Sequence, residues 1–216
     1  MRTRLLWLAL PVVLAACGAP APPVGDQPLD TAFRNEGLTR TETLGQRVFV
    51  SRCATCHGEK GETVSEDFPR LAGQHETYLE KQLRDFQSGA RKSVMNRLAR
   101  GLSGEEVAAI ARYYAAQPAA APASPPSELA AVGRFIHLRG NPYSGIPACK
   151  ACHGESAHGT ATLPRLAGQH AAYLQRQLQE FTQRKRTNDN EVMHTIAERL
   201  TALETRAVAE YLSSLP

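Results

Sequence analysis

The stretch Cys53-Ala54-Thr55-Cys56-His57 returns, with the same spacing, as Cys149-Lys150-Ala151-Cys152-His153. Both stretches have the form CxxCH, which is typical of the covalent attachment of haem c. Two thiols at this spacing can add to the two vinyl groups of one porphyrin, and the adjoining histidine then serves as an axial ligand of the iron. The sequence therefore predicts two haems c, attached through Cys53, Cys56, Cys149 and Cys152 and ligated by His57 and His153.

Three other uses of paired cysteines fit the sequence less well. Zinc ribbons separate their two pairs by roughly 15–20 residues, whereas here nearly a hundred residues with helical patterns of their own intervene. A thioredoxin-like redox pair needs a βαβ pattern around it, and no strand alternation is visible. Disulfides within each pair are chemically possible in an exported protein, but they leave both histidines unexplained.

The segments between and after the two motifs are also duplicated. The heptapeptide 69–75, Pro-Arg-Leu-Ala-Gly-Gln-His, is identical to 164–170, ninety-five residues later. Each copy precedes apolar residues at helical spacing, which we interpret as helices that supply the core: Tyr78, Leu79, Leu83 and Phe86 in the first copy, and Tyr173, Leu174, Leu178 and Phe181 in the second.

Further helices are predicted at both ends of each copy. Apolar spacing predicts helices over residues 43–50 and 131–138, before the two CxxCH motifs. Capping boxes at 103–106 and 201–204 predict the start of a last helix in each copy. The second copy alone carries a Gly- and Pro-rich loop, 139–147, ahead of its motif.

Two methionines occupy equivalent places and are predicted to be the second axial ligands. Apart from the initiator, Met95 and Met193 are the chain's methionines, each about forty residues after its CxxCH motif and within a polar segment. The alternatives are that they fill gaps in a core, or that the equivalent His75 and His170 ligate instead. We interpret those two histidines as surface or supporting residues, and His137, His158 and His194, which have no counterpart in the other copy, as solvated surface residues.

The amino terminus has the pattern of an export signal. Arg2 and Arg4 precede an apolar run that is too short to span a bilayer as a mature helix. The run ends in Leu14-Ala15-Ala16-Cys17, similar to a bacterial lipobox, so residues 1–16 are predicted to be a lipoprotein signal and Cys17 the lipidated residue; the alternative is an ordinary signal with a chance cysteine. The predicted location is the periplasm, with a membrane anchor.

Composition divides the remainder of the chain and limits its partners. Residues 17–40 are predicted to be a flexible tether, 41–116 and 128–216 two domains, and 117–127 a Pro/Ala linker. The formal charge of +4 falls to +2 once the two signal arginines are removed. A nearly neutral mature chain argues against nucleic-acid binding.

With both motifs, the repeated heptapeptide and the two methionine segments in place, residues 40–216 resemble the dihaem cytochrome c4 family. The resemblance implies an all-α fold of two tandem class I cytochrome c domains, each a small helical fold around one covalently bound haem c. It further implies that the carbonyls of Pro69 and Pro164 accept hydrogen bonds from the proximal histidines. By the same resemblance, Arg70, Arg165, Tyr78 and Tyr173 are candidates for contacts with haem propionates.

Closed ligation at both irons predicts an electron carrier rather than an enzyme, since no coordination site is left for a substrate. We expect it to take electrons from a quinol-oxidising complex or a periplasmic dehydrogenase and pass them to a terminal oxidase. One alternative is the electron-transfer subunit of a dehydrogenase complex, of the sulfide-oxidising flavocytochrome type. Another is a dihaem enzyme: a thiosulfate dehydrogenase, whose cysteine ligand has no spare candidate here, or a peroxidase, which would need one methionine to leave its iron.

Overall fold

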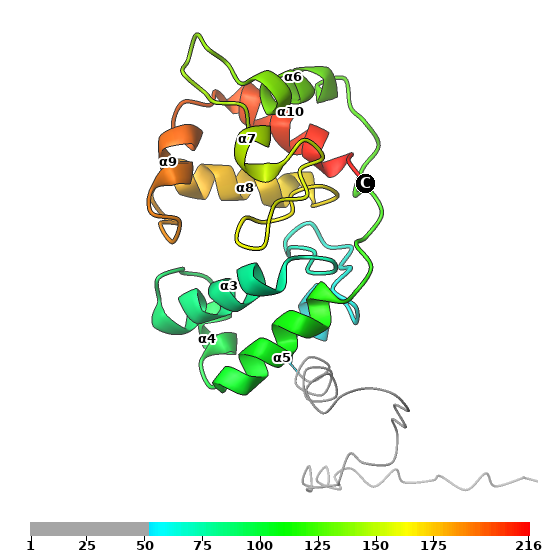
Figure 1. The fold of residues 1–216 in the computed structure, drawn as a ribbon, viewed down its shortest axis with the longest axis vertical. Coiled ribbons are helices and arrows are strands. Elements are labelled where there is room, and N and C mark those ends of the chain that lie inside the picture. Colours follow the sequence, from blue (N-terminus) through cyan, green and yellow to red (C-terminus); the bar gives the residue numbers. More distant parts are fainter. Residues whose placement is uncertain (1–51) are drawn as a thin grey trace, which may run out of the picture. The chain divides into compact units, whose positions relative to one another are not determined.

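The computed structural model describes residues 52–216, and every regular element in this range is an α-helix (Figure 1). The first half, residues 52–116, contains α2 (Ala54–His57), α3 (Glu76–Ser88), α4 (Met95–Ala99) and α5 (Gly104–Ala115). The second half, residues 128–216, contains α6 (Ala130–Arg139), α7 (Lys150–His153), α8 (Ala171–Thr182), α9 (Val192–Ala197) and α10 (Ala202–Ser213). The predicted all-α class is confirmed. The predicted signal, the predicted lipidation site Cys17, the predicted tether and the helix predicted at 43–50 lie outside the described residues.

The last helix of each half begins at the predicted capping box. Ser103 Oγ accepts from the backbone N–H of Glu106 at 3.1 Å, while Glu106 Oε2 accepts from the N–H of Ser103 at 2.7 Å. Thr201 and Glu204 make the same reciprocal pair at the start of α10. Each box satisfies backbone donors that the first helical turn leaves without partners, and so determines where α5 and α10 start.

Each half has its own hydrophobic core, formed between its longer helices. In the first half, α3 packs on α5, and the second half brings α6 and α8 against α10. The apolar stripes predicted for α3 and α8 supply Leu79, Phe86, Leu174 and Phe181 to the buried set. Tyr78 and Tyr173 differ from the prediction, because their hydroxyls accept hydrogen bonds from arginines of the opposite half. These two positions therefore face the boundary between the halves rather than a core.

One glycine allows α6 and α10 to cross closely. A Cβ atom at Gly133 would lie 2.0 Å from the carbonyl oxygen of Ala207, far inside contact distance. The helix pair buries Ile136, Val208 and Leu212 at this crossing. Any side chain at Gly133 would have to push the helices apart and open that core.

The segment that distinguishes the second half, residues 139–147, forms the expected turn. Asn141 and Ile146 exchange both backbone hydrogen bonds, at 2.8 and 2.9 Å. The side chain of Asn141 donates to Glu204 Oε1 at 2.7 Å, which joins the loop to the start of α10. The loop is therefore closed by its own backbone pair and joined to α10, just before the residues that lead into α7.

Candidate haem sites

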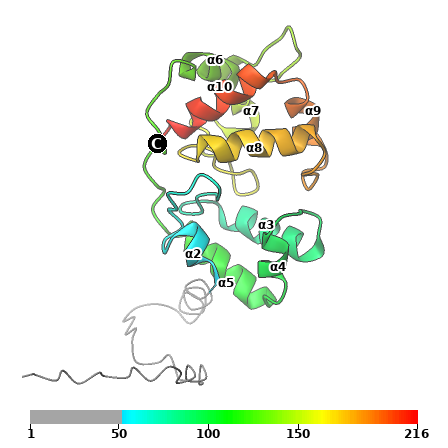
Figure 2. The ribbon, with the colours of Figure 1, turned by 180° about the vertical axis from the view of Figure 1, so that it is seen from behind.

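The first CxxCH motif folds into a single helical turn, α2. Figure 2 shows α2 from the opposite side, beside α5, and Cys53 packs against the core cluster that contains Tyr114. His57 is 5% exposed, and its Nδ1 lies 3.0 Å from the carbonyl oxygen of Pro69. Since a carbonyl only accepts, Nδ1 carries the hydrogen and Nε2 is left with a lone pair. This is the tautomer that a metal ligand requires.

The second motif repeats this geometry in α7. His153 is 8% exposed, and its Nδ1 lies 3.3 Å from the carbonyl oxygen of Pro164. Burial lowers the pKa of both imidazoles below the ordinary value, and the hydrogen bonds to the proline carbonyls oppose that shift only partly. Both rings are therefore neutral at pH 7, as an iron ligand must be.

None of the four motif cysteines forms a disulfide. Burial raises the pKa of the Cys53 and Cys149 thiols to about 11. Cys56 is half-buried and Cys152 is exposed. Among residues 52–216, no three His, Cys, Asp or Glu side chains gather as a metal-binding group, so the two CxxC pairs do not meet at one site.

A cavity beside α2 brings the predicted ligand set of the first half together. Its apolar walls come from α3, α4 and the segment after α4, and its complete lining is Arg52, Cys53, Cys56, His57, Leu83, Met95, Leu98, Ala99 and Leu102. Met95 is the first residue of α4, where its N–H donates to Ser93 Oγ at 3.0 Å. Two thiols, an imidazole and a thioether within one apolar cavity suit a flat apolar macrocycle with nitrogen and sulfur axial ligands. The residues present fit a haem c.

Met193 lies in α9, which takes the place of α4 in the second half. It is half-buried, and its N–H donates to Asp189 Oδ2 at 2.6 Å. Met193 follows Met95 by ninety-eight residues instead of ninety-five. The extra residues precede α9, where Asn190 and Glu191 have positive φ values of 55° and 64°. Its role as ligand remains a prediction from the repeat.

The rival ligands His75 and His170 are engaged elsewhere. His75 Nε2 lies 2.7 Å from the carbonyl oxygen of His158, and His170 Nε2 lies 2.8 Å from that of Thr63. Each contact crosses from one half to the other, and the two are equivalent in the repeat. The imidazole nitrogens thus join the halves, which favours the methionines as axial ligands.

The expectation that His137 and His194 are solvated surface residues is wrong. His137 is fully buried, with Nε2 3.0 Å from the carbonyl oxygen of Glu155. His194 is 8% exposed, with Nδ1 2.9 Å from the carbonyl oxygen of Phe181. A backbone carbonyl partner makes a buried imidazole tolerable, and such partners cannot be identified from sequence spacing. His158 is exposed, as predicted.

The four candidate propionate residues lie at or near the boundary between the halves. Arg70 Nη1 donates to the carbonyls of Ala121 and Gly168, at 2.6 and 3.0 Å. The backbone of Arg165 pairs with the side chain of Gln74. Tyr78 and Tyr173 each accept from an arginine of the other half at 3.1 Å.

The sequence pattern did not single out those arginines, Arg91 and Arg186. It also did not predict the role of the glutamines of the heptapeptides. The signal that could have found them is the constant offset of ninety-five residues, which Arg91 and Arg186 obey. A polar residue repeated at the same offset as the heptapeptides is a candidate for a shared boundary.

Comparison with known proteins agrees with this geometry. The cytochrome c family matches residues 42–136 and 147–216, leaving out most of the turn-rich loop of the second half. Cytochrome c4 of Thiocapsa roseopersicina is 41% identical over 167 residues, which cover 76% of this chain and 86% of that protein. A protein of Stutzerimonas stutzeri named as a thiosulfate dehydrogenase electron acceptor is 44% identical over 169 residues, covering 76% and 78%.

Among solved structures, reduced recombinant cytochrome c4 from Pseudomonas stutzeri superposes with a TM-score of 0.76 at 33% identity. The match covers 81% of this chain and 98% of that one. Because it takes in nearly the whole of that structure, the likeness extends over both halves and over the way in which they are joined along the chain.

Proposed function

This chain belongs to the cytochrome c4 family, and on that premise we propose that it carries electrons in the bacterial periplasm from a respiratory donor to a terminal oxidase. It is a dihaem c-type cytochrome, with one haem c in each cytochrome c domain. When bound, each haem c supplies a reversible one-electron couple. The protein residues attach the group, complete its ligation and exclude substrates from it.

We assign the attachment and ligation as follows. Cys53 and Cys56 form the thioethers of the first haem, and Cys149 and Cys152 those of the second. Nε2 of His57 and Nε2 of His153 are the proximal ligands, oriented by the carbonyls of Pro69 and Pro164. The thioether sulfurs of Met95 and Met193 would complete the ligation of the two irons.

The observation that carries this proposal is the single cavity lined by Cys53, Cys56, His57 and Met95. An iron with both axial positions occupied by protein has no place for a substrate, so the chemistry left to it is electron transfer. Methionine ligation also raises the reduction potential relative to a second histidine, which suits delivery of electrons to an oxidase.

The donor is proposed to be a quinol-oxidising complex or a periplasmic dehydrogenase. Within the second class, thiosulfate dehydrogenase is a specific candidate, supported by the 44% identity to a protein named as its electron acceptor. The two donors can be separated by rapid mixing of the oxidised protein with each reduced donor. A fast bimolecular reduction by only one of them identifies the route.

We further propose that Cys17 carries a lipid anchor and that residues 17–40 form a tether between this anchor and two domains, 41–116 and 128–216, joined by the linker 117–127. The support is the lipobox-like Leu14–Cys17 sequence. Within residues 52–216, no helix has the length and apolar character needed to cross a bilayer.

The carrier proposal is tested by titrating the purified protein with electrons and then challenging it with substrates. We expect reversible uptake of two electrons per chain, without turnover of thiosulfate or peroxide by the protein alone. Rapid peroxide consumption by the reduced protein would make it an enzyme and overturn the proposal.

A further inference from the structure

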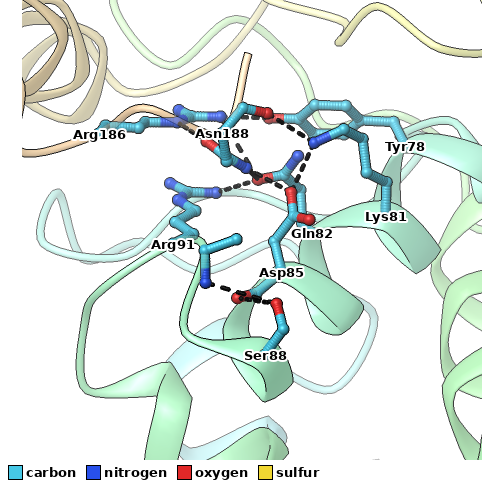
Figure 3. A network of polar contacts seen from close by, with 9 residues as sticks. Tyr78, Lys81, Gln82, Asp85, Ser88, Arg91, Arg186 and Asn188 are labelled. Carbon is cyan, nitrogen blue, oxygen red and sulfur yellow. Dashed lines mark hydrogen bonds and ion pairs between the residues drawn. The ribbon is translucent and has the colours of Figure 1, made fainter. Parts of the chain in front are cut away.

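Two arginines, Arg91 of the first half and Arg186 of the second, are buried where the halves meet. They are equivalent in the repeat and only 9% and 8% exposed. Their backbones pair in an isolated antiparallel bridge, and Figure 3 shows both side chains in one polar network. Removing a permanent cation from water costs free energy, so two of them side by side need a physical reason.

Two glutamines hold the guanidinium groups together. Gln82 Oε1, from α3, accepts from Arg91 Nη1 at 2.7 Å and from Arg186 Nη2 at 3.4 Å. Gln177 Oε1, from α8, accepts from Arg91 Nη2 and from Arg186 Nη1, both at 2.7 Å. Because both cations donate to the same oxygens, their positive charges are near neighbours.

The remaining partners of this pair include tyrosines and phenylalanines rather than carboxylates. Each guanidinium donates to a tyrosine of the opposite half and lies over a phenylalanine ring of its own half, a cation–π contact. For Arg91 these are Tyr173 at 3.1 Å and Phe86 at 4.8 Å, and for Arg186 they are Tyr78 at 3.1 Å and Phe181 at 4.6 Å. These partners satisfy the donors without forming an ion pair.

The nearby carboxylates have other partners. Asp85 Oδ2 accepts from Lys81 Nζ at 2.5 Å and from Asn188 Nδ2 at 2.6 Å, and Glu180 Oε2 accepts from the side-chain amide of Gln177 at 2.9 Å. Neither arginine forms an ion pair with any carboxylate of residues 52–216. The three positive side chains Arg91, Arg186 and Lys81 and these two carboxylates together carry one net positive charge.

The pair contacts the helix that lines the first cavity, α3, and its equivalent in the second half, α8. On α3, Leu83 lines the cavity that contains Met95, while the adjacent Gln82 binds the arginines. On α8, Leu174 belongs to the second core, while Gln177 binds the same arginines. α3 therefore contacts both the first cavity and the arginine pair, and α8 contacts both the second core and the same pair.

We propose that Arg91 and Arg186 form a shared cationic pair that raises the reduction potentials of both haems together. This inference rests on the proposed haem sites. Adding an electron lowers the charge of a redox centre by one, and a buried cation stabilises the reduced state because little water screens it. Since each guanidinium contacts both halves, removing either one acts on both centres.

The test is a spectroelectrochemical titration of the dihaem protein and its variants Arg91→Gln and Arg186→Gln. For each single variant we expect both midpoint potentials to fall, with the equilibrium constant for reduction lower by about tenfold, or about 59 mV for a one-electron couple. Gln82→Glu, which keeps the shape and adds a negative charge between the cations, lowers both potentials in the same way and does not depend on losing an arginine.

Two controls separate charge from structure. Arg84→Gln removes a cation from the exposed face of α3, where the side chain is 55% exposed and screened, and leaves both potentials nearly unchanged. Arg91→Lys keeps the positive charge, so both midpoint potentials should stay close to those of the parent protein. A shift confined to the haem of the mutated half, or no shift at either haem, would overturn the shared pair. A haemochrome count below two per chain in the parent protein would instead refute the haem sites.

Discussion

Gln169 forms two hydrogen bonds with the backbone of Arg70: its Oε1 accepts from the Arg70 N–H at 2.9 Å and its Nε2 donates to the Arg70 carbonyl at 3.0 Å. Gln74 makes the same pair of bonds to Arg165, at 2.9 and 3.0 Å. Both glutamines are buried, at 6% and 7% exposure. Each copy of the heptapeptide thus binds the other across the boundary.

Gln169→Ala should lower the free energy of unfolding by about 1–3 kcal/mol, because both backbone polar groups of Arg70 lose their partner in a partly buried place. Chemical denaturation of the dihaem protein measures the change. Gln179→Ala, on the exposed side of α8, is the matched control and should change stability by less than about 0.5 kcal/mol. Equal effects of the two variants would mean that the boundary contact does not stabilise the fold.

Met95→Ala and Met193→Ala should each open one iron to carbon monoxide and leave the other closed, so that about half of the haem binds the gas. Optical difference spectra of the reduced variants measure this fraction. Leu98→Ala, which alters the same cavity without removing a ligand atom, should bind none. If neither methionine variant binds carbon monoxide, the axial assignment is wrong.

Much of this fold could be predicted from the internal repeat and from the residues that cap its helices. The capping boxes at Ser103 and Thr201 predicted the starts of α5 and α10, because a cap is a local interaction among four residues. The burial of His137 and the turn of Tyr78 toward Arg186 could not be predicted in this way. They depend on a carbonyl and a guanidinium that the chain brings near from a distant part of the sequence.

The residues of the candidate site likewise fall into those that could be predicted from the sequence and those that required the structure. The attachment residues and the methionines follow from spacing and from the chemistry of haem ligation. The Arg91–Arg186 pair required the structure, since a polar segment such as 91–94 carries no local sign that its first residue is buried. Only the packing of the two halves shows which of several repeated polar residues meet.

Acid should weaken the start of α10 through Glu204. Burial alone would raise the pKa of this carboxyl, but hydrogen bonds from the Thr201 N–H, the Asn141 amide and the Thr201 hydroxyl lower it below the usual range. A depressed folded-state pKa adds stability above the unfolded-state value of about 4.3, and that stability is lost as the pH falls through the folded-state value.

We therefore expect Glu204→Gln to be less stable than the parent protein at pH 7, with a difference that shrinks as the pH falls below about 4. Denaturation midpoints measured across this range give the difference directly. Glu66→Gln, in an exposed loop, is the control and should show no such trend. A Glu204→Gln difference that stays constant with pH would rule out the carboxylate as the stabilising form.

Cys17→Ser should move the protein from the membrane fraction to the soluble periplasmic fraction, because stable anchoring needs the acyl chains that the thiol would carry. Fractionation followed by haem staining measures the distribution. The haem content of the variant should equal that of the parent. Unchanged membrane association would reject the lipid anchor.

The most direct test of the central claim is the optical spectrum of the purified protein, oxidised and reduced, with a pyridine haemochrome count and exposure to carbon monoxide. The account predicts two haems c per chain, a weak long-wavelength band from methionine ligation in the oxidised state, and no carbon monoxide binding. A missing methionine band, or carbon monoxide bound at either iron of the unaltered protein, would contradict a closed dihaem electron carrier.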